Sequence, residues 1–156
     1  MQISFRERGG LWVLAQLALM VAILAAGPGL RADSRPGWAL FAAGILLLAG
    51  AATGLAGFAA LGRNRTVFPR PNQASVLVSQ GIYARIRHPL YTSVMCLAGA
   101  WSLGWWSWGT GTLAVGLAAL LMAKARREEA WLRRQFPGYA DYARRVPRFL
   151  PRRFGE

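Results

Sequence analysis

Two clusters of ionisable residues border the same long uncharged stretch, Pro89 to Ala123. The first is residues 87–91, with the sequence Arg-His-Pro-Leu-Tyr, and the second is the pair Glu128 and Glu129. Charged groups at the ends of membrane spans are costly to desolvate, so they are candidates for a functional site. A guanidinium binds anions and a carboxylate binds cations. Together the clusters predict a site for a ligand that carries both charges.

The elements that position these clusters are predicted to be membrane helices. Residues 11–30 and 37–62 also lack charged side chains, and the third stretch is interrupted by a Trp-rich turn at residues 104–108. A spanning helix needs roughly 20 apolar residues. We therefore expect an all-α membrane protein with about four transmembrane helices. The last two form a helical hairpin, followed by a cytoplasmic C-terminal amphipathic helix and an extended tail.

The chain has 156 residues and is predicted to be a single integral membrane domain. Its expected parts are two N-terminal spans (1–62), a cytoplasmic connector (63–88), the helical hairpin (89–124) and a cytoplasmic C-terminal segment (125–156). The N-terminus has features of a signal peptide, but three further spans favour a retained helix.

Small residues and prolines predict where the first two spans end and pack. We expect the first span at about residues 10–27, because Gly27-Pro28-Gly29 is a helix stop. In the second span, Gly50 and Gly54 are four residues apart, which allows another helix to approach closely. Packing within the bundle is favoured over homodimerisation, and the oligomeric state is left open.

The net charge of +13 is distributed unevenly. With four spans, 17 of the 19 Lys and Arg residues fall on one side, and the exceptions are Arg31 and Arg35. The positive-inside rule makes the basic side cytoplasmic, with both termini and the predicted site on it. We expect a multi-pass protein of a bacterial inner membrane, whose basic surface contacts anionic lipid headgroups and not nucleic acid.

The hairpin brings the two ionisable clusters together. If its turn is centred near Trp106 and Ser107, position 89 lies level with about 124, and 128 with about 85. The N-terminus of the third span also presents unpaired N–H groups, which bind anions. S-Adenosylmethionine carries an α-carboxylate, an α-ammonium and a sulfonium, so it matches this site.

Simpler interpretations exist for each residue alone. Arg87 can extend to lipid phosphates, His88 can act only as a helix cap, and Tyr91 can be an interfacial aromatic. The two glutamates can be neutralised by neighbouring arginines. A metal site is not expected, because one His and one Cys cannot form a structural zinc site.

The C-terminal half, residues 75–151, resembles the isoprenylcysteine carboxyl methyltransferase family, and membrane phospholipid N-methyltransferases are similar in the same region. The resemblance rests on the following residues: Gly81, Tyr83, Arg87, His88, Pro89, Tyr91, Glu128, Glu129, Leu132, Phe136, Tyr139, Tyr142 and Val146-Pro147-Arg148-Phe149-Leu150-Pro151. One position departs from the pattern, because Ser93 stands where family members commonly have glycine.

The resemblance implies an S-adenosylmethionine pocket between the last spans and the C-terminal segment. The residues implied to bind the cofactor are Tyr83, Arg87, His88, Pro89, Tyr91, Glu128, Glu129 and Tyr142. Arg87, Glu129 and Arg148 are the predicted catalytic residues. An arginine could hold a carboxylate acceptor, whereas a glutamate could take the proton of an amine acceptor.

The predicted function is methyl transfer from S-adenosylmethionine to a lipid or lipidated acceptor in the bilayer. The acceptor can be an isoprenylcysteine carboxylate, a phospholipid amine, a thiol or a phenol, because generic apolar residues line its path. Two alternatives are an NADPH-dependent membrane reductase similar to sterol reductases, and a non-catalytic scaffold that binds anionic lipid.

Overall fold

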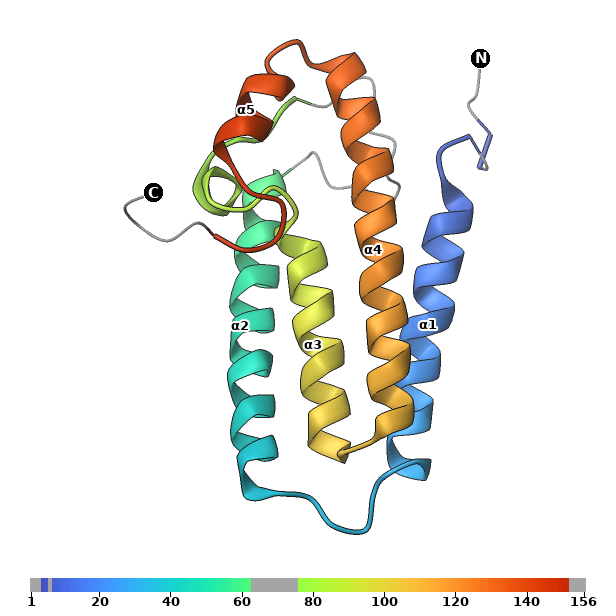
Figure 1. The fold of residues 1–156 in the computed structure, drawn as a ribbon. Coiled ribbons are helices and arrows are strands. Elements are labelled where there is room, and N and C mark those ends of the chain that lie inside the picture. The colour runs from blue at the N-terminus through green and yellow to red at the C-terminus, as the bar shows by residue number, and fades with distance from the viewer. Residues whose placement is uncertain (1–3, 6, 63–75, 152–156) are drawn as a thin grey trace.

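The computed structural model describes residues 4, 5, 7–62 and 76–151 (Figure 1). Its helices are α1 (Gly10–Gly29), α2 (Gly37–Leu61), the 3₁₀ helix η2 (Gly81–Ala84), α3 (Pro89–Trp105), α4 (Trp108–Gln135) and α5 (Tyr139–Arg145). No β-strand occurs among the described residues, which confirms the predicted all-α class. About half of the predicted connector, residues 63–75, lies outside the described residues.

Within the described residues, three helices, α1, α2 and α4, are long and apolar enough to cross a membrane. The fourth, α3, has 17 residues, and at 1.5 Å per residue it is ~25 Å long, slightly less than the bilayer core. It contacts α1, α2 and α4, so it is the central helix of the bundle (Figure 1). The predicted hairpin is therefore α3 followed by α4, and the number of four spans stays a prediction.

A two-residue turn joins α3 to α4 where the sequence predicts it. Trp106 has φ 49° and ψ 52°, a left-handed conformation that is uncommon for a residue with a side chain. Ser107 caps α4, because its Oγ accepts a hydrogen bond of 3.3 Å from the Thr110 N–H. The short turn forces the two helices to run antiparallel and side by side.

The first helix continues two residues beyond its predicted end. α1 includes Pro28 and ends at Gly29, and the Leu30 N–H then donates to the Ala26 carbonyl at 3.0 Å. Gly27 does not end the helix; its missing side chain allows α1 to approach α3 closely. A Cβ at this position would lie 2.5 Å from the indole Nε1 of Trp101 on α3.

The glycines of α2 allow it to pack closely on α3. A Cβ at Gly50 would lie 3.0 Å from Leu97, and one at Gly57 would lie 3.1 Å from Pro89. Between them, a Cβ at Gly54 would lie 2.5 Å from the Oγ of Ser93. The glycine spacing therefore serves packing within the bundle, which confirms the favoured interpretation.

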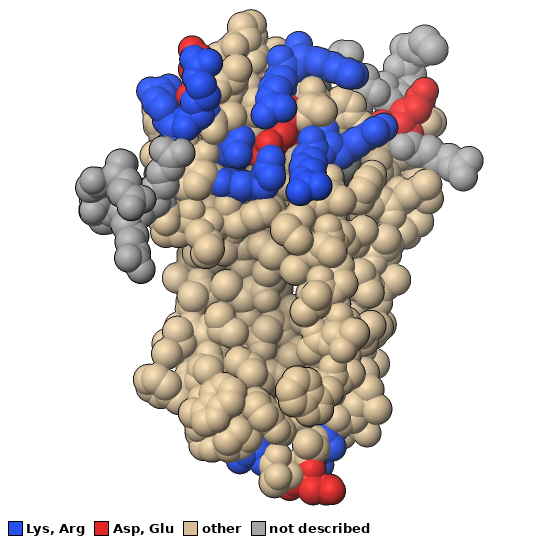
Figure 2. Space-filling view, viewed as in Figure 1, with Lys and Arg blue, Asp and Glu red and all other residues tan. Residues whose placement is uncertain are grey.

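The two ends of the bundle differ in charge. We call the end with η2, α5 and the N-terminus of α3 the polar end, and the end with the α1–α2 loop the loop end (Figure 1). Figure 2 shows Lys and Arg gathered at the polar end, an uncharged middle, and a small charged group at the loop end. α4 passes through Lys124 without a break, so it carries the apolar segment and the predicted amphipathic segment in one helix.

Candidate functional site

The carboxylate of Glu129 is the centre of the polar end. This residue of α4 is 1% exposed. Arg148 donates to both of its oxygens, from Nε and from Nη2, at 2.8 Å each. His88 Nε2 lies 3.1 Å and Arg87 Nη1 lies 3.4 Å from Oε1. Three segments far apart in the sequence thus meet at one buried charge, and we call Arg87, His88, Glu129 and Arg148 the Glu129 cluster.

His88 connects this cluster to the neighbouring acid. It precedes Pro89, which occupies the first position of α3, where its missing N–H costs no helical hydrogen bond. The Nδ1 atom of His88 lies 3.8 Å from Glu128 Oε2. The imidazole also stacks on Tyr91, with ring centroids 5.2 Å apart and an angle of 5° between the planes.

Glu128 has a different environment from its neighbour. Consecutive residues of a helix point in directions about 100° apart, so the two carboxylates meet different partners. The Tyr91 hydroxyl donates to Glu128 Oε2 at 2.7 Å. The Glu128 side chain is 26% exposed, against 1% for Glu129. Glu128 is therefore the glutamate of the pair that an outside ligand can reach.

The C-terminal tail lies across the N-terminus of α3. The N–H groups of Arg87 and His88 donate to the carbonyls of Pro147 and Arg148, at 2.9 and 3.0 Å. The Thr92 hydroxyl donates to the Phe149 carbonyl at 2.9 Å. These hydrogen bonds hold the predicted tail across the polar end. They also bring Arg148 within reach of Glu129.

Three tyrosines support the cluster from the η2 and α5 side. The Tyr142 hydroxyl donates to the Tyr83 carbonyl at 2.7 Å, and burial raises the pKa of Tyr142 to about 12. Tyr139 is 1% exposed. Neither its hydroxyl nor the buried Nε of Arg87 has a hydrogen-bond partner of normal geometry among the described residues. The Tyr139 hydroxyl and the Arg87 guanidinium nevertheless interact with each other, so Tyr139 supports the cluster from behind.

A family profile described as phospholipid methyltransferase matches residues 38–138 of this chain. The matched region covers α3, most of α2 and all of α4, and thus both glutamates and the 87–91 segment. The chain belongs to the phospholipid methyltransferase family. This result confirms the family expected from the sequence resemblance.

Two relatives of this family member carry names that refer to metals. The cobalt-zinc-cadmium resistance protein CzcN of Cupriavidus metallidurans is 41% identical over 81 residues, 50% of this chain and 37% of CzcN. The nickel-cobalt-cadmium resistance protein NccN of Alcaligenes xylosoxydans xylosoxydans is 31% identical over 150 residues, 94% of this chain and 66% of NccN. The chain thus aligns with less than two thirds of either relative's length.

The structure brings most of the predicted site residues of this phospholipid methyltransferase family member together. Around the two glutamates lie Arg87, His88, Tyr91 and Arg148, while Tyr83 and Tyr142 lie behind them. Pro89 is the exception, because its ring packs toward Gly57 of α2. No group of three or more His, Cys, Asp or Glu side chains suited to a metal ion occurs among the described residues.

Ser93, the departure from the family pattern, faces α2 and not the glutamates. Its hydroxyl donates to the Gly50 carbonyl at 2.6 Å, and Gly54 leaves room for it. Its effect is therefore on helix packing. Two further residues belong to the site: Tyr139, which was named from the sequence only in the resemblance, and Gln16, which was not singled out. Tyr139 has a detectable signal, since it follows the Phe-Pro-Gly helix stop at 136–138.

Gln16 has a weaker signal, because it is a single polar residue within the apolar stretch 11–30, where polar side chains are costly. Its Oε1 accepts a hydrogen bond of 2.7 Å from Lys124 Nζ, which joins α1 to α4. Lys124 is 3% exposed, and its ammonium lies 5.3 Å from the centroid of the Tyr91 ring. Lys124 thus extends the polar site one helical turn toward the apolar middle of the bundle.

Proposed function

We propose that this chain is an S-adenosylmethionine-dependent methyltransferase that methylates a lipid or lipidated acceptor at the cytoplasmic face of a membrane. The observation that carries the proposal is the meeting of basic and acidic groups at the polar end of a phospholipid methyltransferase family member. The excess of Lys and Arg at this end supports a cytoplasmic orientation.

The residues present fit the cofactor. Its carboxylate would bind the guanidinium groups of Arg87 and Arg148, which concentrate positive charge at the polar end. Its ammonium would bind Glu128, the more exposed acid. The rings of Tyr91 and Phe149, which flank His88, offer an aromatic surface for the adenine. When bound, the cofactor supplies an activated methyl group.

The chain's own residues would contribute position and charge. Aligning a nucleophile with the methyl donor and excluding water account for most of the catalysis expected here. Glu128 would accept the proton of an amine acceptor, since it is partly exposed and hydrogen-bonded by Tyr91. Glu129 would act as a positioning residue, because Arg148, His88 and Arg87 already occupy its oxygens. A carboxylate acceptor would need no base, and Arg148 would orient it.

The names of CzcN and NccN refer to metal resistance, a role separate from the methyl transfer proposed for this chain. Metal tolerance of a strain and methyl-transfer activity of the protein can be measured separately. A strain carrying the gene with Glu128→Gln would show whether any tolerance depends on the methyl-transfer site.

Two measurements test the proposed function. Calorimetry with the purified full chain in lipid nanodiscs should show binding of S-adenosylmethionine, weakened at least about tenfold by Glu128→Gln. Asp141→Asn, an exposed acid on α5, is the matched control and should bind normally. Radiolabelled methyl transfer to membrane lipids and to prenylated thiols should then identify the acceptor.

The alternatives predict different results in the same experiments. Thermal stabilisation by NADPH and not by S-adenosylmethionine would support a membrane reductase. Anionic lipid binding with no cofactor binding at all would support a scaffold. Either result would overturn the proposed methyltransferase.

A further inference from the structure

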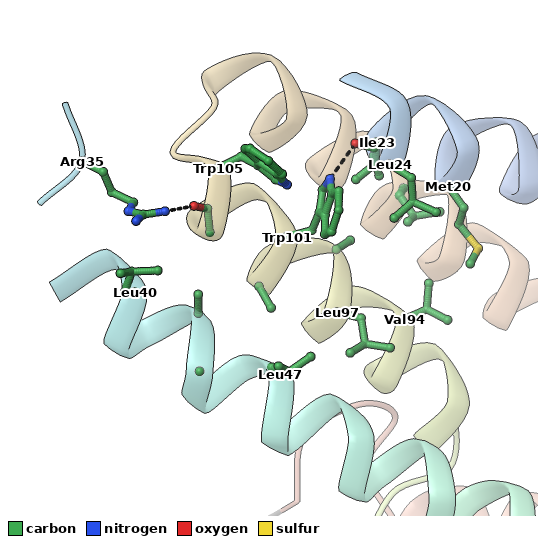
Figure 3. A pocket seen from close by; sticks show the side chains of 16 residues that line it. Met20, Ile23, Leu24, Arg35, Leu40, Leu47, Val94, Leu97, Trp101 and Trp105 are labelled. Carbon is green, nitrogen blue, oxygen red and sulfur yellow. Dashed lines mark hydrogen bonds between the residues drawn. The ribbon is translucent and has the colours of Figure 1, made fainter. Parts of the chain in front are cut away.

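An apolar cavity lies in the loop-end half of the bundle, away from the two glutamates (Figure 3). Its volume is about 830 Å³, within the usual range of small-molecule sites. α3 forms its floor together with Leu117 of α4, and α1 and α2 form its walls, with Met20, Ile23, Leu40, Leu47, Leu97 and Trp101 among the lining residues. Leu40 and Leu47 are half exposed, so the cavity opens toward the surrounding bilayer.

The position of the cavity along α3 separates it from the proposed methyl-transfer site. Val94 and Trp105 are the first and last α3 residues that line it. At 1.5 Å per residue they lie ~9 and ~26 Å from His88 along the helix axis. The hydrocarbon core of a bilayer is roughly 30 Å thick, so each leaflet covers about half of this length. The cavity therefore belongs mainly to the leaflet at the loop end.

Of the described residues that line the cavity, a single one is charged. Arg35, from the α1–α2 loop, lies at its outer end, where Nη1 donates to the Gly104 carbonyl (Figure 3). A guanidinium has five N–H donors, so this bond leaves others for an anionic group. The Trp101 indole N–H is already used, because it donates to the Ile23 carbonyl at 3.0 Å. The site thus combines an apolar interior with one cation at the membrane edge.

We propose that this cavity binds a phospholipid with a net negative headgroup from the loop-end leaflet. One acyl chain occupies the space between α1 and α2, and the phosphate contacts Arg35. The Arg35 cation attracts a headgroup of net negative charge more strongly than a zwitterionic one, whose ammonium offsets the phosphate, and the apolar walls accept the chain. The lipid is bound independently of the methyl acceptor, whose headgroup belongs at the opposite end of α3.

The chain offers two substitutions that test this site without disturbing its walls. Gly44 lines the cavity, and a Cβ added there meets no atom within 4 Å, so Gly44→Phe fills the space. Arg35→Gln removes the cation. Gly116 on α4 also has open space and does not line the cavity, so Gly116→Phe is the control for size. Arg31→Gln, in the same loop, is the control for charge.

Native mass spectrometry of the full chain, released from nanodiscs of equal phosphatidylglycerol and phosphatidylcholine, measures the bound lipid. We expect one retained phosphatidylglycerol per chain. Arg35→Gln should reduce this retention about fivefold, as expected for the loss of one basic residue near an anionic lipid. Gly44→Phe should abolish it, whereas Arg31→Gln and Gly116→Phe should leave it within about twofold.

Three results would overturn the proposal. Equal retention of the two lipids would show ordinary annular contact. Unchanged retention in Arg35→Gln would remove the role of the cation. A dimer that Gly44→Phe dissociates, with lipid binding unaltered, would show that a second copy of the chain occupies the cavity. None of these results depends on S-adenosylmethionine binding, so the proposed function is tested separately.

Discussion

Arg148 of the C-terminal tail and Glu129 of α4 form a bidentate ion pair, with both hydrogen bonds 2.8 Å long. The Glu129 side chain is 1% exposed and that of Arg148 is 31% exposed. Hydrogen bonding to Glu129 raises the pKa of Arg148 above its already high usual value, so the guanidinium stays charged. The pair fastens the tail to the helix bundle at the proposed site.

Loss of this pair should destabilise the protein strongly. Arg148→Gln leaves a buried carboxylate without its main partner, and we expect a loss of about 2–4 kcal/mol in the free energy of unfolding. Thermal unfolding in detergent measures the change. The control is Arg144→Gln, which breaks an exposed pair with Asp141 and should cost at most about 0.5 kcal/mol. Equal effects of the two substitutions would contradict the structural role of Arg148.

Substitution of Glu128 and substitution of Glu129 should affect cofactor binding and protein stability differently. Glu128→Gln should weaken S-adenosylmethionine binding while the unfolding temperature changes little, because Glu128 is partly exposed. Glu129→Gln should lower both the affinity for S-adenosylmethionine and the unfolding temperature, since it removes the counter-ion of Arg87 and Arg148. Calorimetry and thermal unfolding on the same samples distinguish the two patterns. A stable Glu129→Gln protein with reduced binding alone would assign Glu129 to the ligand directly.

The contact between α2 and α3 should show strong coupling between Gly54 and Ser93. In Gly54→Ala the new Cβ meets the Ser93 Oγ at 2.5 Å, and we expect a cost of about 1–3 kcal/mol. Ser93→Gly removes that oxygen, so the double variant should recover most of the loss. Gly44→Ala, which meets no atom within 4 Å, is the control. Additive effects in unfolding measurements would show that the helices pack differently.

Stability should fall at alkaline pH partly through Tyr142. Its pKa is raised from 10.0 to about 12, mainly by burial, so its contribution is complete below pH 10.0 and is lost as the pH rises through about 12. Tyr142→Phe loses the hydrogen bond to the Tyr83 carbonyl, and should be about 1 kcal/mol less stable at neutral pH. Its unfolding temperature should then fall less than that of the wild type between about pH 9 and 11. Parallel decreases in the two proteins would contradict this role of Tyr142.

The orientation in the membrane can be tested by labelling introduced cysteines. With Cys96 replaced by alanine, Ser34→Cys at the loop end should react with an impermeant maleimide in intact cells. Arg144→Cys at the polar end should react only after permeabilisation, because the basic end is predicted to be cytoplasmic. The reverse labelling pattern would place the proposed site on the outer face.

Helix positions were largely predictable because they follow from composition over many residues. The uncharged stretch at 37–62 predicts α2, observed at Gly37–Leu61, and the turn at Trp106 and Ser107 was placed correctly. The end of α1 was not, because a Gly-Pro-Gly sequence stops many helices. Here Gly27 is present to accommodate the indole of Trp101, a contact between residues 74 positions apart.

The sequence by itself determined the all-α class, the family and the set of ionisable residues that meet at one end. Hydropathy and charge are patterns of neighbouring residues along the chain, so the sequence alone reveals them. Only the tertiary structure decided which glutamate is buried and which helix Ser93 contacts. It also decided that Arg148 reaches Glu129. It also created the cavity beside Arg35, which is lined by residues of four helices. These features depend on the relative rotation of packed helices and on where the tail folds, and both are set by contacts between residues distant in the sequence.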